Sequence, residues 1–179
     1  MGRFRVRSFL MGILFTLLVS AALGLGALYS GYIPAAADTK PSKFERWAAK
    51  TSLRETIQRD TRGTTVPPAP DTKELLHAVQ LYGANCAVCH GAADGKPSKI
   101  AKGFYIRSPQ LGEHGVEDDP VTETYWKVKH GIRFTGMPAF GGTLSDDDVW
   151  ALAGFLKTMD KLPPAVDAAW QKIPSAAAP

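Results

Sequence analysis

The feature that most limits how this chain can fold is the run Cys86-Ala87-Val88-Cys89-His90. Its two cysteines are the only ones in 179 residues, and at three positions apart they cannot link distant segments as a disulfide framework does. On a helix, residues i, i+3 and i+4 share one face, so both thiols and the imidazole point the same way. This C-x-x-C-H pattern is typical of haem attachment, with two thioether bonds to the porphyrin and a histidine on the iron.

Two other chemistries also use closely spaced cysteines. A thiol–disulfide redox pair is expected in a βαβ context, and a structural zinc site needs a second ligand pair at comparable spacing. The sequence has neither feature. We therefore expect one covalently attached haem c, held by Cys86, Cys89 and His90.

The sixth ligand of the iron is predicted to be Met137. It lies in a loop between Gly136 and Pro138, which together impose a non-helical backbone path that suits a ligand better than a core filler. The other methionines belong to the N-terminal segment or to the end of the last predicted helix.

Three histidines compete with Met137 for that position. His77 lies on the helix that leads into the cysteine motif, and His114 lies in a polar loop. His130 precedes the methionine loop and is the main alternative, and an imidazole there would give a lower potential than a thioether.

The N-terminal segment is predicted to cross a membrane. No charged residue occurs in residues 8–33, and a helix of these 26 residues would be about 39 Å long, longer than the roughly 30 Å hydrocarbon core of a bilayer. The basic residues 1–7 should remain cytoplasmic, which places the remainder outside. A cleaved signal peptide is the alternative, because small residues follow at 35–37, although its apolar core normally covers only about 7–15 residues.

The remainder of the chain divides into four predicted segments. Residues 38–60 have apolar side chains at helical spacing and indicate a juxtamembrane amphipathic helix. Its apolar face could pack on the membrane surface, on a partner protein or on the haem domain. Residues 61–71 are rich in proline and indicate a linker at a domain boundary. Residues 72–160 form the haem domain, and residues 161–179 form a loose tail rich in proline and alanine.

Three longer helices are expected within the haem domain. Asp71 or Thr72 can cap the first, which leads into the cysteine motif, and residues 121–129 form the second. Ser145 and Asp148 resemble a capping box that opens the third, which runs through Met159. No segment between them alternates with a period of two, so we predict an all-α fold around one covalent haem, preceded by a single transmembrane helix.

Charge argues against a nucleic-acid partner. Arg3, Arg5 and Arg7 supply three of the four net positive charges, and no cluster of basic residues with interleaved aromatic residues follows.

These motifs together resemble class I c-type cytochromes, and more closely the membrane-anchored monohaem cytochromes of proteobacteria. The resemblance is carried by residues 86–91, 126–132, 136–140 and 144–152. It implies an inner-membrane protein with its haem domain in the periplasm, in which the first and last helices cross near the haem, so that Tyr82 and Gly83 approach the region around Trp150. It also implies that a loop carbonyl orients His90, with Pro97 and Pro109 both open.

The expected function is electron transfer rather than enzymatic catalysis. With His90 and Met137 both bound, the iron has no open position for a substrate, and we expect an apolar pocket of Leu111, Phe104, Ile132, Phe140 and Trp126. A haem sensor or gas binder would need a labile sixth ligand, and a peroxidase would need an open distal face.

Redox proteins are the expected partners: a quinol-oxidising complex, a dehydrogenase or a terminal oxidase. The chain would serve them either as a respiratory carrier or as a subunit of the complex. Small residues at every fourth position of the anchor, from Gly12 to Gly24, favour the subunit.

Overall fold

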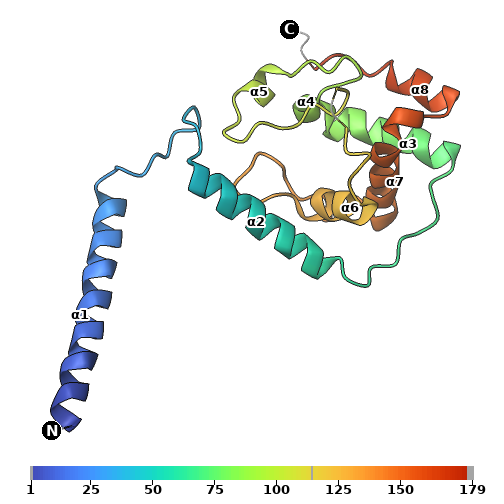
Figure 1. Ribbon diagram of the computed structural model, residues 1–179. Helices are drawn as coiled ribbons and strands as arrows, with labels where there is room; N and C mark the ends of the chain where they lie inside the picture. The colour runs from blue at the N-terminus through green and yellow to red at the C-terminus, as the bar shows by residue number, and fades with distance from the viewer. Residues whose placement is uncertain (1, 114, 177–179) are drawn as a thin grey trace. The chain divides into compact units, whose positions relative to one another are not determined.

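The computed structural model describes residues 2–113 and 115–176, and within these ranges it contains helices and no strand (Figure 1). The prediction of an all-α fold is confirmed for that part of the chain. The helices form two compact units, Met1–Thr39 and Lys40–Pro179.

The first unit contains one long helix, α1 (Gly2–Tyr29). Its segment Val6–Tyr29 is 24 residues long with a mean hydropathy of 2.2, and all of its side chains are exposed. These are the length and composition of a helix that can cross a bilayer. The helix ends at Tyr29, so the last residues of the predicted span, 30–33, lie beyond it.

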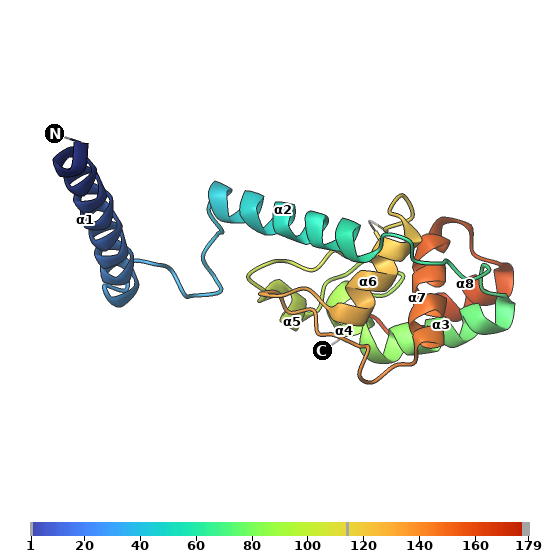
Figure 2. The same cartoon turned by 90° about the horizontal axis from the view of Figure 1, so that it is seen from below.

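The second unit is built around two packed helices, α3 and α7. Helix α6 packs on α7, α8 packs on α3, and α2 lies against α6 (Figures 1 and 2). The bounds are α2 (Lys43–Asp60), α3 (Thr72–Asn85), α4 (Ala87–His90), α5 (Lys99–Lys102), α6 (Val121–His130), α7 (Asp146–Lys157), a 3₁₀ turn η1 (Met159–Lys161) and α8 (Pro164–Trp170).

Two capping boxes define where the central helices begin. The Asp71 carboxylate accepts from the backbone of Glu74, whose own carboxylate accepts from the Asp71 backbone. Ser145 and Asp148 make the same exchange at the start of α7. Each box satisfies backbone donors that the first helical turn leaves free, so these starts follow from local sequence, as predicted.

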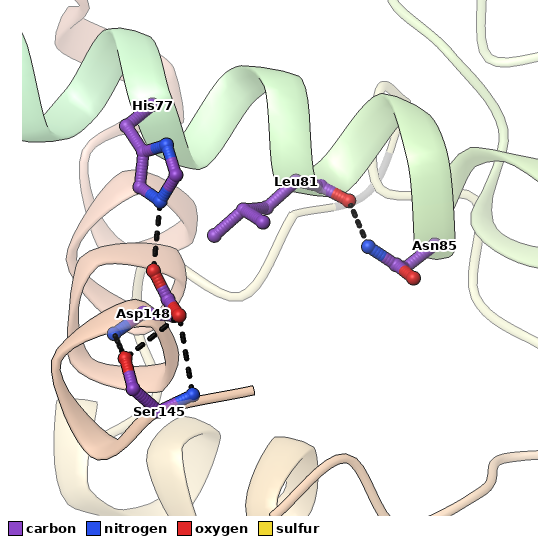
Figure 3. A network of polar contacts seen from close by, with 5 residues as sticks. All are labelled: His77, Leu81, Asn85, Ser145 and Asp148. Carbon is purple, nitrogen blue, oxygen red and sulfur yellow. Dashed lines mark hydrogen bonds and ion pairs between the residues drawn. The ribbon is translucent and has the colours of Figure 1, made fainter. Parts of the chain in front are cut away.

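Helices α3 and α7 are also joined by an ion pair through Asp148. His77 Nε2 lies 2.7 Å from one carboxylate oxygen, while Ser145 Oγ donates to the other (Figure 3). The Ser145 hydroxyl, and after it His77, hold the pKa of the Asp148 carboxyl below its ordinary value. His77 is therefore part of the contact between these two helices.

The C-terminal segment differs from its prediction as a loose tail. Residues 164–170 form α8, which begins with Pro164 in the first turn, where proline is favoured. Val166 and Trp170 on this helix are buried, and Ile173 packs against Gly83. The spacing of these three residues, i, i+4 and i+7, is a helical signal that the surrounding alanines and prolines obscure.

An aromatic cluster of Tyr82, Phe155 and Trp170 fills the centre of this unit. The three rings meet edge to face with centroids 5.1–5.9 Å apart, a preferred aromatic geometry. The expected packing of the first helix on the last is present as α3 on α7, where Tyr82 meets Phe155, while Gly83 lies against Ile173 after α8. Trp150 points to another face of α7 and stacks on Tyr125, with centroids 3.9 Å apart.

Helix α2 belongs to the same compact unit as the helices after it. Ile57 is buried, and Trp126 Nε1 donates to the Asp60 carboxylate over 3.2 Å. The proline-rich stretch also packs on the unit, because a Cβ at Gly154 of α7 would lie 2.5 Å from Pro70 Cγ. The predicted linker thus connects two parts of one unit, and the boundary between units falls at residues 39–40.

Candidate haem-binding site

A cavity of about 250 Å³ lies within the second unit, and its lining is mainly apolar. It is lined by Cys86, Cys89 and His90 from the motif and by Met137 from the loop after α6. All four residues predicted to hold the haem therefore meet at one cavity, although Met137 is 47 positions after His90 in the sequence.

The motif occupies the junction of two helices. Cys86 ends α3 and begins α4, its backbone N–H donating to the Tyr82 carbonyl over 2.8 Å, while the His90 N–H donates to the Cys86 carbonyl. The helical turn from Cys86 to His90 is the geometry that the i, i+3, i+4 spacing predicted. It directs both thiols and the imidazole to the cavity.

The state of the thiols argues against a dithiol redox site. Burial raises the pKa of the Cys86 thiol to about 12 and also raises the pKa of Cys89. Reactive redox cysteines have lowered pKa values, because the thiolate is the nucleophile. Nor do the described residues contain a group of three or more His, Cys, Asp or Glu side chains placed to hold a metal ion, as a zinc site would require.

His90 is oriented by a backbone carbonyl. Its Nδ1 lies 2.9 Å from the Pro109 oxygen, which can only accept, so Nδ1 carries the proton and Nε2 keeps its lone pair. Burial lowers the pKa of His90, which favours this neutral form. Of the two prolines left open by the sequence, the structure selects Pro109.

Residues 108–111 make a set of hydrogen bonds to the motif that the sequence did not reveal. The Ser108 hydroxyl and the Gln110 amide both donate to the Cys89 carbonyl, over 2.5 and 3.1 Å, and the Leu111 N–H donates to the His90 carbonyl. We call residues 108–111 the motif brace. Serine and glutamine are common in loops, and only the fold brings these two within reach of a segment 19–21 positions away.

Removing both side-chain donors of the motif brace should destabilise the domain. In Ser108→Ala/Gln110→Ala the Cys89 carbonyl loses two hydrogen bonds, which we expect to cost about 1–3 kcal/mol of unfolding free energy. Urea unfolding followed by far-UV circular dichroism measures this loss. The matched control is Gln171→Ala, whose amide is exposed and hydrogen-bonds to Asp167 over 3.3 Å; an equal loss in the control would contradict a specific role for the brace.

In the loop that carries Met137, both the N–H and the carbonyl of the methionine are hydrogen-bonded. Ile132 N–H donates to the Met137 carbonyl over 3.2 Å, and Met137 N–H donates to Thr135 Oγ1 over 3.1 Å. Gly136 packs beneath the Phe104 ring, where a Cβ would lie 2.9 Å from ring carbons. A side chain at this position would have to displace the Phe104 ring, so glycine is favoured there.

The competing histidines lie elsewhere or outside the described residues. His130 is exposed and does not line the cavity. Its ring contacts that of Trp126, with the ring centroids 5.0 Å apart. His77 pairs with Asp148 between α3 and α7 (Figure 3). His114 falls outside the described residues.

Four of the five predicted apolar pocket residues line the cavity: Leu111, Phe104, Ile132 and Phe140. The prediction was wrong for Trp126, whose indole donates to Asp60 of α2 and whose ring lies on His130. Leu53 of α2 lines the cavity instead, a residue that the sequence did not suggest. Periodicity places Trp126 on one face of α6 but does not identify which helix covers that face.

Sequence comparison with known proteins assigns this domain to a family independently of the site geometry. Residues 73–156 match the family described as cytochrome C oxidase, cbb3-type, subunit III. Cytochrome c6 of Diacronema lutheri is 28% identical over 83 residues, which are 46% of this chain and 93% of that protein. Cytochrome c6 of Gracilaria tenuistipitata var. liui is 33% identical over 78 residues, which are 43% of this chain and 65% of that protein. No solved structure gave a significant match.

The cavity fits the cofactor of such proteins. Two neutral thiols, a histidine with a free ring nitrogen and a thioether line an apolar site, and these groups fit a haem that is attached through the thiols. The all-helical fold, the C-x-x-C-H motif and the matching relatives converge on one assignment: the domain spanning residues 73–156 is a class I c-type cytochrome domain, which carries covalent haem c and transfers single electrons.

Proposed function

We propose that this chain is a membrane-anchored cytochrome whose haem is bound through Cys86 and Cys89, with His90 and Met137 as the two axial ligands. The observation that carries the proposal is the meeting of the C-x-x-C-H motif and Met137 at one mainly apolar cavity. The deprotonated Nε2 of His90 and the hydrogen-bonded N–H and carbonyl of Met137 support these roles.

A haem iron with both axial positions filled by these residues would supply one-electron chemistry and no open site for a substrate. The apolar wall of Leu111, Ile132 and Phe140 would lie against the haem and disfavour the more highly charged oxidised state. Together with thioether ligation, this wall supports a relatively high reduction potential. The motif brace and the Pro109 carbonyl hold the histidine in one orientation, which limits the rearrangement that accompanies electron transfer.

The anchor and its orientation are part of the proposal. The 24-residue apolar segment of α1 is longer than the core of a typical signal peptide, which supports a retained anchor in the inner membrane. The basic residues before it support a cytoplasmic N-terminus, with the haem domain in the periplasm. The partners would be a quinol-oxidising complex, a dehydrogenase or a terminal oxidase.

Two modes of action are compatible with such an anchor: a tethered carrier and a subunit of a membrane redox complex. The matching family is described as an oxidase subunit, which supports the second mode, as does the stripe of small residues on α1. Copurification of a redox complex after mild detergent solubilisation is the expected result for a subunit. Isolation as a monomer without such a complex would favour the carrier.

A redox titration of the full-length haem protein tests the proposed function. We expect one transition with a slope of about 59 mV per decade, as a single-electron couple requires. The reduced spectrum should not change when carbon monoxide is added, because no axial position is open. A spectral shift with carbon monoxide would contradict the proposal and favour a haem sensor or gas binder.

A further inference from the structure

The first turns of α2 carry two large aromatic side chains that the unit does not bury. Phe44 is 73% exposed and Trp47 is 62% exposed, and their ring centroids lie 5.7 Å apart. The later turns of the same helix behave differently, because Ile57 is buried and Leu53 lines the cavity. The apolar face of α2 is thus covered by the unit at one end only.

This aromatic pair belongs to an ordered part of the molecule. The helix start is capped, with Ser42 Oγ accepting from the Glu45 N–H over 3.1 Å. The Tyr105 hydroxyl donates to the Glu45 carboxylate over 2.5 Å, which ties the first turn to the loop after α5. Phe44 and Trp47 are therefore presented on a helix fixed to the unit, and a surface that contacts them also sets the orientation of the unit.

The position of the pair in the chain indicates what covers it. Residues 30–42 separate the end of α1 from the start of α2, and 13 residues reach at most about 45 Å and on average about 20 Å. If α1 spans a bilayer, this connection keeps the aromatic pair on average about 20 Å from the end of α1, within reach of the surface of that bilayer.

The side chains around the pair suit a lipid surface. Tryptophan concentrates at membrane–water interfaces, where its ring is buried and its N–H remains hydrated. Lys40, Lys43, Arg46 and Lys50 are all exposed around the same turns, and basic side chains beside an aromatic anchor attract anionic headgroups. Glu45, the acidic residue among them, is bound by Tyr105.

We propose that Phe44 and Trp47 insert into the interfacial region of the bilayer that α1 spans, so that the haem domain is held at the membrane in one orientation. The inference rests on the proposed anchor and adds a second, peripheral contact to it. This second contact would fix which side of the haem domain faces partner proteins in the same membrane. Only partners that reach that side could approach closely enough for electron transfer.

Spin labels on α2 test this contact in the full-length haem protein reconstituted into nanodiscs of phosphatidylcholine and phosphatidylglycerol. One label replaces the aromatic side chain in Trp47→Cys, and the control label is placed in Ala49→Cys. Residue 49 is exposed and lies about 200° around the same helix, on its opposite face. The parent protein, with both cysteines bound to haem, should take up no label.

Collision with oxygen, which concentrates in lipid, and with a water-soluble nickel chelate measures the environment of each label. At position 47 the ratio of oxygen to nickel accessibility should be roughly tenfold higher than at position 49, as expected for a side chain about 5–10 Å deep in the interface. Adding Phe44→Ser to the Trp47→Cys protein should lower that ratio towards the control value.

Two outcomes would overturn the inference. Equal access of the nickel chelate to both positions would mean that the aromatic pair faces water. Protection of position 47 from both reagents would mean that protein covers it, either a partner or a second copy. Mass spectrometry of the same sample reports separately whether residues 1–37 are retained, so a cleaved anchor is distinguished from a retained anchor with a water-exposed aromatic pair.

Discussion

Replacing Met137 by alanine is expected to abolish six-coordinate, low-spin haem while leaving the haem covalently attached. The thioether is lost, and the described part of the cavity lining offers no second imidazole to replace it. Axial ligands set haem potentials over a range of about 0.8 V, and loss of a thioether lowers the potential. Optical spectra should therefore show a high-spin haem that binds carbon monoxide when reduced, and the redox titration should show a lower midpoint.

The chain offers two matched controls for this variant. Met159→Ala removes another methionine that packs against the core but does not line the cavity, so its spectrum should remain that of the parent. His130→Ala tests the main rival ligand, and its spectrum should also be unchanged because that side chain is exposed on α6. A high-spin spectrum in His130→Ala, with an unchanged spectrum in Met137→Ala, would assign the position to the histidine.

The second large effect is expected from Trp170→Ala in α8. Trp170 is 5% exposed and packs edge to face on Tyr82 and Phe155, so its truncation leaves a cavity at the contact of α3, α7 and α8. Buried tryptophan-to-alanine substitutions cost about 3–5 kcal/mol. We expect a loss of that size in urea unfolding, and a fall in Tm of more than about 10 °C.

The control for Trp170 is another tryptophan. Trp47→Ala removes a side chain of the same size that is 62% exposed, and in detergent it should change the unfolding free energy by no more than about 0.5 kcal/mol. A Trp170 variant as stable as the parent would mean that residues 164–170 do not stabilise the haem domain, as the loose-tail prediction implied.

Several features of the site could be predicted because they depend on residues close together in the chain. The C-x-x-C-H motif places its thiols and imidazole on one turn by helix periodicity alone. The cap at Asp71 and the capping box at Ser145 depend on side chains three positions away, and both form as predicted; Glu74 completes a second box at Asp71. The glycine and proline around Met137 indicated a non-helical loop, and the structure has one there.

Other features depended on contacts between distant segments. The choice of Pro109 over Pro97 to orient His90, and the bonds from Ser108 and Gln110 to Cys89, join residues 19–21 positions apart. Trp126 was expected in the pocket, but its indole N–H donates to Asp60 of α2. No local sequence pattern specifies which helix packs on a given helix face, because that depends on how the whole unit folds.

By itself, the sequence determined the local features of this protein: a motif for covalent haem, a methionine loop, the capped starts of the central helices and an apolar N-terminal segment. Only the tertiary structure decided which groups surround the motif and that α8 completes the core through Trp170. The physical reason is the sequence separation of the interacting residues. Periodicity, caps and turns are set by neighbours within about four residues, whereas burial and long-range hydrogen bonds are set by segments that meet only after the chain has folded.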